Sequence, residues 1–222
     1  MTTRVIILLG PPGGGKGTQA VRLSAELKIP HVSTGDLFRE NRAQGTELGR
    51  RAQSFMDSGK LVPDDLVLDM LFDRVSRPDC KAGYLLDGFP RTIPQATALD
   101  ARLAAAKSSV QAIHLKVPDS VLVERVVGRR TCSKCGNIHH VKNSPPRVAD
   151  TCDKCGGPLV QRTDDTAAVV QKRLATYHEQ TAPIVGHYGE KKGVLSEIDG
   201  NRAPDQVYSD LERIVASSKA GH

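Results

Sequence analysis

The sequence predicts an α/β fold, a doubly wound, five-stranded parallel sheet that carries two insertions. The first observation is an apolar run at residues 5–9 that leads through a glycine-rich loop into a helical stretch. The second is that four more short apolar runs follow and alternate with helical patterns, which is typical of parallel sheets. The third is that this alternation is interrupted twice, once by two crowded helices and once by a stretch rich in glycine, proline and cysteine.

Length and composition indicate a globular protein with an anionic partner. At 222 residues, 39% of them hydrophobic and 25% charged, the chain can bury a sizeable core. The formal net charge of +6 predicts that the partner is nucleic acid or a small phosphorylated ligand. No apolar run reaches the length of a membrane span, and the first one is too short for a signal peptide, so we expect a cytoplasmic protein. In that reducing compartment its five cysteines would be thiols or metal ligands.

Residues 10–18, with the sequence GPPGGGKGT, match a phosphate-binding loop at Gly10, Gly15 and Lys16. Backbone amides at the start of the following helix can bind an anion, and the Lys16 ammonium can reach the β- and γ-phosphates of a nucleotide. The strict pattern places Ser or Thr directly after the lysine, whereas here Gly17 intervenes and the hydroxyl lies on Thr18. A glycine-rich turn with a chance lysine is the alternative, and the flanking strand and helix argue against it.

The helix after this loop is expected at residues 16–28, because apolar residues there have helical spacing and Pro30 prevents its continuation. A short strand is expected at residues 31–33. Residues 33–36, Ser-Thr-Gly-Asp, have capping-box spacing and start a helix, and a second helix is expected at residues 46–58. These two helices form a compact insertion.

Two further strands and the start of two helices follow. Pro63 begins a helix with one apolar face, and the buried strand at residues 84–86 delivers Asp87 at its carboxyl end. That is where P-loop enzymes keep an acid that holds magnesium or its waters. A strand at residues 112–117 is followed by Pro118, which begins another helix. Because ligands of doubly wound sheets bind beyond the carboxyl ends of the strands, Asp87 is expected at the site.

The helix that begins at Pro118 is expected to continue to Arg130, which places Arg125 and Arg129 on one face at i,i+4 spacing. Like charges so placed destabilise an isolated helix by about 0.2–0.5 kcal/mol. A bound polyphosphate would reverse that penalty. Solvated surface arginines are the alternative interpretation.

The second interruption, beginning near Thr131, contains two CxxC pairs. Cys132 and Cys135 form the first pair, Cys152 and Cys155 the second, and the spacing between the pairs is that of a zinc ribbon. Four thiolates fill a tetrahedral shell and leave no open position, so the metal would be structural. Four unliganded thiols are the alternative. The fifth cysteine, Cys80, has no partner in the sequence and is expected to be a buried thiol.

The chain then returns to the alternating pattern. A long helix is expected from Thr166, and Pro183 kinks or ends it. A last strand at residues 194–198 and a helix at residues 204–216 close the fold, and residues 217–222 are expected to be a frayed tail.

Taken together, these motifs resemble the adenylate kinase family, in its long-lid form with a four-cysteine zinc ribbon. The matching stretches span nearly the whole chain: residues 10–19, 33–36, 59–62, 86–91, 94–95, 127–130, 162–165 and 177–183 and the four cysteines. The resemblance implies a P-loop kinase core at residues 1–32, 62–128 and 166–222, an AMP-binding insertion at 33–61 and a zinc-ribbon lid at 129–165. It also implies reversible transfer of the γ-phosphoryl group of MgATP to AMP, giving two ADP, by a monomer that maintains adenine nucleotide balance.

The resemblance also implies the site residues. ATP would contact Gly13, Gly14, Gly15, Lys16, Gly17, Thr18, Arg125, Arg129, Ile138, His139 and Arg202. AMP would contact Thr34, Arg39, Lys60, Leu61, Val62, Gly88, Phe89, Pro90, Arg91, Gln95, Arg162 and Arg173. The catalytic residues would be Lys16, Arg39, Arg91, Arg129, Arg162, Arg173 and Asp87. Asp36 and Asp87 would order the waters of Mg²⁺, the structural Zn²⁺ would bind to the four cysteines, and Asp164 and Asp165 would join the arginines. His139 and Arg202 depart from the family, which commonly has an aromatic residue and a backbone carbonyl contact at those places.

The chemistry expected from this set is positioning and charge stabilisation. The phosphate of AMP is already a good nucleophile, so no strong general base is required. Alternatives remain open: another nucleoside monophosphate kinase, a GTP-using AMP kinase of the same fold, or a nucleotide-gated nucleic-acid-binding module that uses the ribbon and the +6 charge. Thr34 and Gln95 favour AMP as the acceptor, and we expect neither nucleic acid nor a membrane as a partner.

Overall fold

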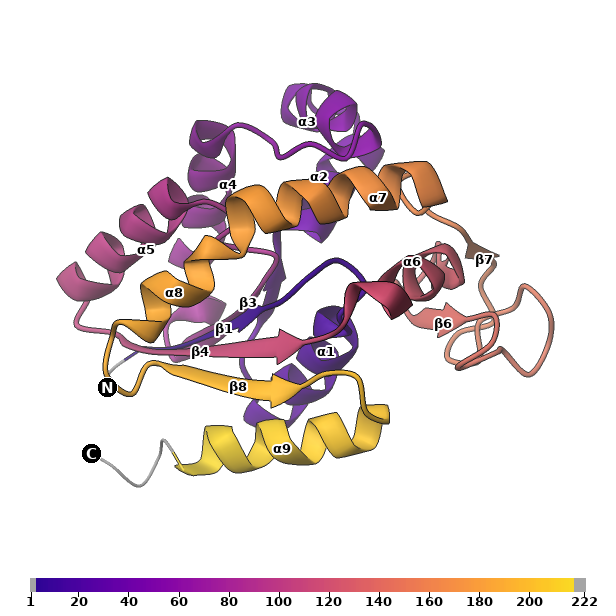
Figure 1. Cartoon of the computed structure of the whole chain (residues 1–222). Coiled ribbons are helices and arrows are strands. Elements are labelled where there is room, and N and C mark those ends of the chain that lie inside the picture. Colours follow the sequence, from indigo (N-terminus) through magenta and orange to yellow (C-terminus); the bar gives the residue numbers. More distant parts are fainter. Residues whose placement is uncertain (1–2, 218–222) are drawn as a thin grey trace.

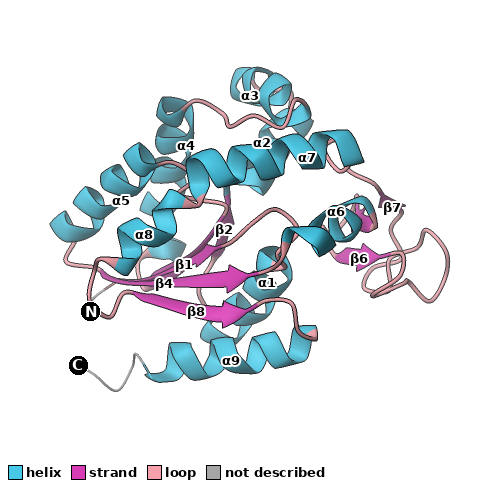
Figure 2. Ribbon diagram, in the orientation of Figure 1, coloured by secondary structure: helices cyan, strands magenta, loops and turns pink. Residues whose placement is uncertain are grey.

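The computed structural model describes residues 3–217, and within them five parallel strands form the central sheet. Their order is β2-β3-β1-β4-β8. The bounds are Arg4–Leu9 for β1, His31–Ser33 for β2, Gly83–Asp87 for β3, Ser109–Lys116 for β4 and Leu195–Asp199 for β8. Figure 2 shows the sheet at the centre of the molecule with helices above and below it. The predicted doubly wound, five-stranded parallel sheet is therefore confirmed.

The sheet is buried on both faces, which explains why its strands show no polar alternation. On one face, Ile6 and Leu8 of β1 pack against α1 (Lys16–Leu27) and α9 (Pro204–Ser217). On the other face, the alternate residues of β1 pack against α4 (Asp64–Ser76), α5 (Ile93–Ala105) and α8 (Pro183–Gly189). Figure 1 shows these helices on opposite sides of the strands. The lone Cys80, in a short 3₁₀ helix, is buried in the second of these clusters, as expected.

The first insertion consists of the two predicted helices, α2 (Thr34–Ala43) and α3 (Glu47–Asp57). Their starts are capped as the sequence indicates. The Ser33 hydroxyl accepts a hydrogen bond from the Asp36 N–H at 3.3 Å, and the Thr46 hydroxyl accepts one from the Gly49 N–H at 3.1 Å. In Figure 1 both helices lie on the side of the molecule away from α9.

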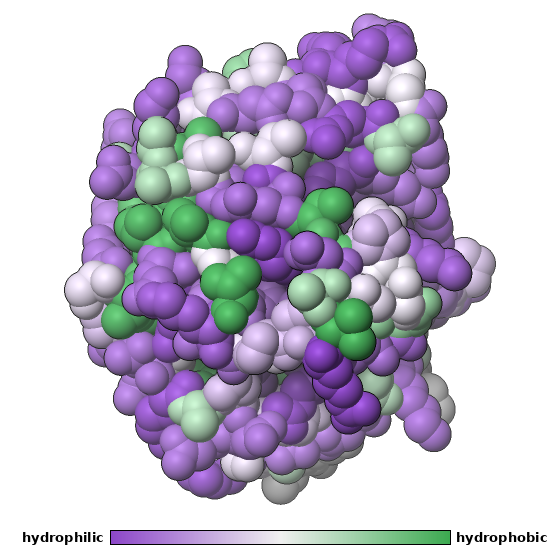
Figure 3. Space-filling view, turned by 90° about the vertical axis from the view of Figure 1, so that its right-hand side faces the viewer, coloured by the Kyte–Doolittle hydropathy of each residue, from purple (hydrophilic) through white to green (hydrophobic). Residues whose placement is uncertain are grey.

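The second insertion is a small antiparallel sheet at the far end of the molecule from α5 (Figure 1). Its strands are β5 (Arg129–Cys132), β6 (Ile138–His140) and β7 (Leu159–Val160), in the order β6-β5-β7. Figure 3 views the molecule from this end, where the surface is largely hydrophilic and the hydrophobic residues occur in small groups.

One predicted helix ends earlier than expected. The helix after Pro118 is α6 (Asp119–Val127), and Arg129 lies on β5, so the prediction that Arg125 and Arg129 share a helical face is wrong. Pairing with β6 prevails over helix continuation: Arg129 is opposite His140 in the ladder. A Cβ at Gly128 would lie 2.3 Å from the His140 ring, so only glycine fits this close approach.

Three other elements refine the predictions. The helix from Thr166 is α7 (Ala167–Thr176), and it continues through a π-helical turn, Tyr177–Thr181, into α8, whose first residue is Pro183. The proline therefore marks a break, as predicted. Helix α5 was not predicted, although Thr92 caps it by accepting a hydrogen bond from the Gln95 N–H at 3.2 Å.

Of the predicted tail at residues 217–222, only Ser217 lies among the described residues, and it is the last residue of α9. The rest of that prediction lies outside them. Among residues 3–217, no helix is both long and apolar enough to cross a membrane.

Candidate active site

A cavity of about 700 Å³ opens beyond the carboxyl ends of the strands. Its walls come from the glycine-rich loop, the start of α2, the turn after β3, the lid strand β6 and helix α7. Every residue predicted to contact ATP lines it, and so does every residue predicted to contact AMP except Phe89. Phe89 is 1% exposed and packs in the core, so its side chain does not reach the cavity. The structure thus brings together two predicted half-sites that are far apart in sequence.

The glycine-rich loop is shaped to bind an anion. Gly13 and Gly15 have φ angles of 81° and 86°, a conformation that favours glycine, and Gly15 is the N-cap of α1. The loop therefore presents the first backbone amides of α1 to the cavity. Lys16 curls over the loop, and its Nζ donates to the carbonyl oxygens of Gly10 at 2.7 Å and Pro11 at 2.8 Å.

The positive charge of Lys16 is poorly compensated by the protein groups around it. Burial lowers its pKa to about 8, the Asp87 carboxylate opposes this shift, and Arg91 and Arg173 add to it. Such a group gains from an incoming polyphosphate, because that ligand supplies the missing negative charge.

Asp87 faces the loop from the end of β3. A Cβ at Gly17 would lie 3.4 Å from Asp87 Oδ2, and the same oxygen lies 3.3 Å from His31 Nε2. Burial raises the pKa of Asp87, but the His31 hydrogen bond and the Lys16 charge outweigh it and the net shift is downward. Asp87 is therefore ionised, and its carboxylate oxygens, which could bind a metal ion or its waters, lie beside the phosphate loop. His31 was not among the predicted site residues.

The turn after β3 is held by its own polar groups. The Thr34 hydroxyl and Arg91 Nε both donate to the Gly88 carbonyl, at 2.8 and 2.7 Å. Gln95 is 1% exposed, and its Oε1 accepts from the Arg91 N–H at 2.8 Å while its Nε2 donates to Asp64 at 2.7 Å. These contacts fix the orientation of a small polar wall on the side of the cavity that α2 borders.

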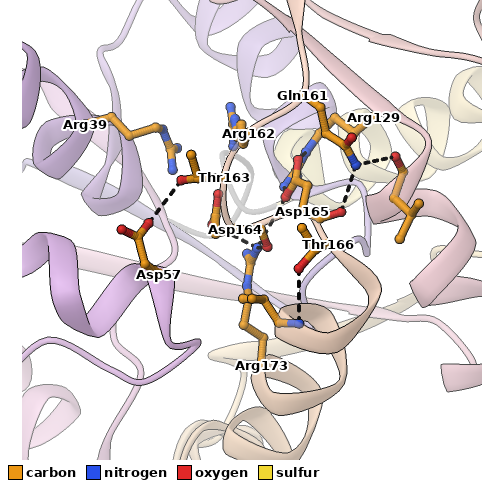
Figure 4. Close-up of polar contacts among 12 residues, drawn as sticks. Arg39, Asp57, Arg129, Gln161, Arg162, Thr163, Asp164, Asp165, Thr166 and Arg173 are labelled. Carbon is orange, nitrogen blue, oxygen red and sulfur yellow. Dashed lines mark hydrogen bonds and ion pairs between the residues drawn. The ribbon is translucent and has the colours of Figure 1, made fainter.

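Arginines from several separate elements converge on the same cavity, as Figure 4 shows for four of them. They are Arg39 on α2, Arg91 after β3, Arg129 on β5, Arg162 after β7 and Arg173 on α7. Burial, the Arg173 charge and the Arg39 charge hold the pKa of Arg91 down at about 10, and burial with the Arg39 and Arg129 charges does the same for Arg162. Cations that lower one another's pKa in this way form a site for a multiply charged anion.

Aspartates hold Arg129 and Arg173 in place (Figure 4). Asp165, with a fully buried side chain, accepts from Arg129 Nε at 2.8 Å and Nη2 at 2.5 Å, and lies 3.4 Å from Arg173 Nη1. Asp164 accepts from the same Arg173 nitrogen at 2.9 Å. The expected link between Asp164, Asp165 and the arginines is present. Asp36 instead pairs with Arg39 at 2.5 Å and lies 3.9 Å from Arg162.

Two contacts at the base of the lid were not predicted. The Gln161 amide donates to the carbonyl oxygens of Val127 and Asp165, both at 3.0 Å, and so ties together the two chain segments that enter and leave the lid. The Thr163 hydroxyl donates to Asp57 of α3 at 3.0 Å, which joins the lid base to the first insertion (Figure 4). Nothing local in the sequence pairs residues 106 positions apart.

The far end of the cavity is formed by groups around Arg125. Arg125 Nη2 donates to the Asn201 side chain at 2.8 Å and Nη1 to the Gly200 carbonyl at 3.2 Å. Arg202 is paired with Asp210 at the rim. This end therefore offers a guanidinium held in a fixed plane, which is suited to stacking on a flat ring.

The four lid cysteines are arranged as a metal site. Their sulfurs all lie within 4.8 Å of one another, with Cys132 and Cys155 at 3.5 Å and Cys135 and Cys152 at 3.7 Å. A zinc–sulfur bond of about 2.3 Å gives a tetrahedral edge of about 3.8 Å, which is close to these separations. The Lys134 N–H points at the Cys132 sulfur at 3.4 Å, as it would toward a thiolate. A Cβ at Gly157 would lie 2.8 Å from Lys134 Cβ and 3.0 Å from that sulfur, so glycine suits this close approach. The residues fit zinc.

Comparisons with known proteins agree with this geometry. The family model described as adenylate kinase matches residues 8–193. An adenylate kinase of Symbiobacterium thermophilum is 51% identical over 215 residues, which cover 96% of this chain and 99% of the relative. An adenylate kinase of Desulforudis audaxviator is 52% identical over 207 residues, which cover 93% of this chain and 96% of the relative. One of Caldanaerobacter subterraneus is 47% identical over 215 residues, which cover 96% of this chain and 97% of the relative.

Proposed function

The chain belongs to the adenylate kinase family, and we propose from that premise which of its residues carry each part of the reaction. It is an enzyme that reversibly transfers the γ-phosphoryl group of MgATP to AMP, giving two ADP. The observation that carries the residue assignment is the convergence of five arginines and Lys16 on one cavity that the phosphate loop also lines.

ATP is proposed to bind with its phosphates on the loop. The backbone amides of residues 13–18 and the Lys16 ammonium would hold the β- and γ-phosphates. The adenine would lie at the other end, against Arg125 and between the lid residues Ile138 and His139 on one side and Arg202 on the other. All of these line the same cavity, which supports one continuous site for the nucleotide.

AMP is proposed to bind on the side formed by α2 and the turn after β3. Thr34, Gly88 and Gln95 would form the adenine wall, with Lys60, Leu61, Val62 and Pro90 around the base and ribose. Arg39 and Arg91 would hold the phosphate. The rigid hydrogen bonds of Thr34 and Gln95 support a wall that accepts one base and rejects others, since a mismatched base leaves buried polar groups unpaired.

Catalysis is proposed to be electrostatic. Arg129, Arg162 and Arg173 line the same cavity as both half-sites, and they would stabilise the charge that spreads over the transferred phosphoryl group. A single well-placed arginine can contribute about 10³–10⁵ in rate in related phosphoryl transfers. Asp164 and Asp165 orient the Arg129 and Arg173 guanidiniums, so the positions of these two cations are set before the substrates arrive.

Two metals are proposed, with separate roles. Magnesium bound with ATP supplies charge neutralisation of the triphosphate, and the hydroxyl of Thr18 and the carboxylates of Asp87 and Asp36 would hold it directly or through its waters. Zinc is proposed at the four lid cysteines, where a full thiolate shell allows it to order the lid without taking part in the chemistry.

The organisation follows the same lines. We propose that the insertion at residues 33–61 and the lid at residues 129–165 move against a core of residues 1–32, 62–128 and 166–222. Closure would exclude water, which is a competing nucleophile. The adenylate kinase lid is a standard example of a lid that closes over its substrates. None of the five cysteines is in a disulfide, which is consistent with the cytoplasmic location that we propose. We also propose a monomer that binds no nucleic acid.

The test is ADP production from ATP with AMP, CMP, UMP and GMP in turn, and from GTP with AMP. We expect AMP to be preferred as the acceptor and ATP as the donor. An equal rate with a pyrimidine monophosphate would contradict the proposed acceptor wall, and an equal rate with GTP would contradict the proposed adenine contacts of ATP.

A further inference from the structure

His139 belongs both to the small sheet of the lid and to the wall of the nucleotide cavity. It is the middle residue of β6, it is 5% exposed, and it forms part of the cavity wall next to Ile138. In the lid sheet it lies opposite Arg130, the second residue of β5, two positions before Cys132. His139 therefore lies in the cavity wall and in the strand that pairs with the one carrying Cys132.

The proton of this ring is placed by a neighbour. Asn137 Nδ2 lies 3.0 Å from His139 Nε2. An amide nitrogen can only donate, so Nε2 must be the acceptor, and the neutral ring carries its proton on Nδ1. Asn137 thus fixes the tautomer, as the outer partners of metal-site histidines commonly do.

The second ring nitrogen, Nδ1, is the one left to interact with the metal cradle. Nδ1 is buried and has no hydrogen-bond partner of regular geometry among the described residues. The His139 side chain is nevertheless near enough to hydrogen-bond the Cys152 sulfur. A buried N–H without an acceptor is unfavourable, and a metal-bound thiolate is a much better acceptor than a neutral thiol.

We propose that His139 is a positioning residue of the lid metal site, whose Nδ1–H donates to the Cys152 thiolate when zinc is bound, with Asn137 holding the required tautomer. The inference rests on the proposed zinc site. Four thiolates around Zn²⁺ carry a net charge of −2, and a donor hydrogen bond delocalises part of that charge. His139 thereby raises zinc affinity and fixes the lid wall next to ATP by the same contact.

The first test measures zinc affinity of the full chain by competition with a chromophoric chelator. His139→Leu keeps a side chain of substantial volume but loses the donor, and we expect zinc binding to weaken about 10- to 100-fold, the usual effect of removing an outer-shell partner. His139→Asn keeps a donor nitrogen near the Nδ1 position, and we expect it to recover most of the affinity. His140→Leu is the matched control, because His140 accepts from the backbone N–H groups of Lys142 and Asn143, both at 3.0 Å, and serves the lid fold.

The second test reads the sulfur directly. In cobalt-substituted protein, losing a hydrogen bond to a thiolate makes the sulfur a stronger donor and moves the sulfur-to-cobalt charge-transfer band to lower energy. We expect that shift in His139→Leu and no shift in His139→Asn or His140→Leu. If His139→Leu only loosened the lid, zinc binding would weaken but the charge-transfer band would not shift.

The outcomes separate this inference from the proposed zinc site. If the folded wild-type chain binds no zinc, the zinc site itself is wrong. If the wild type binds zinc and His139→Leu retains both its affinity and its cobalt band, the zinc site stands and the role of His139 is overturned. Equal losses in His139→Leu and His139→Asn with an unchanged band would also overturn it, because packing alone would then explain the effect.

Discussion

Replacing Asp165 by asparagine tests whether the buried carboxylate holds the arginines of the site in place. The side chain is fully buried and accepts two hydrogen bonds from Arg129, with Arg173 at 3.4 Å. Asn has nearly the same volume, but its NH₂ group must face a guanidinium that can only donate. The change therefore leaves buried positive charge uncompensated while the packing is preserved.

The magnitude follows from this geometry. Removing one partner of a buried ion pair costs about 3–5 kcal/mol, and the surviving asparagine oxygen can still accept one hydrogen bond, so we take about 3 kcal/mol. For a chain of this size that corresponds to a fall in Tm of about 6–12 °C. Turnover should fall at least about tenfold, because Arg129 is no longer aimed at the transferred phosphoryl group.

The assay combines calorimetric melting with coupled ADP production, and it has a matched control. Asp205→Asn makes the same chemical change in a surface ion pair, in which Asp205 is 90% exposed and 2.6 Å from Arg22. We expect that variant to change stability by less than about 1 kcal/mol and turnover very little. If Asp165→Asn resembled Asp205→Asn in both measurements, the assigned positioning role would be refuted.

Three further predictions concern the phosphate loop and the lid. Lys16→Met should lower turnover at least about a hundredfold with an unchanged circular dichroism spectrum, since it removes charge from the transition state; near-normal turnover would mean that Lys16 is misplaced. Because burial holds the Lys16 pKa at about 8 and bound triphosphate must raise it, ATP binding near pH 8 should take up protons. Calorimetric titration in buffers of different ionisation enthalpy measures this uptake, and proton release would contradict the reasoning. Replacing Cys132 and Cys135 by serine should abolish zinc content and lower the Tm, while activity at low temperature largely survives. Loss of turnover in a fully folded, zinc-free protein would show that the metal does more than order the lid.

Much of the fold could be predicted because its signals are local. The run at residues 5–8 is fully or almost fully buried, and its lack of polar alternation records a strand covered on both faces. The loop around Gly15 and Lys16 and the spacing of the cysteine pairs each depend on residues a few positions apart. Turn geometry and metal geometry constrain such short stretches directly. Most of the remaining site residues were predicted from the family resemblance that these motifs support.

What only the tertiary structure decided depends on contacts between distant residues. Helix α6 ends at Val127 because the next segment pairs with β6, a partner that helix propensity cannot anticipate. Phe89 turns into the core although its neighbours line the cavity. The bond from Thr163 to Asp57 spans 106 positions. Periodicity and capping are properties of neighbouring residues, whereas these features exist only once the sheet and its insertions have brought separate segments together.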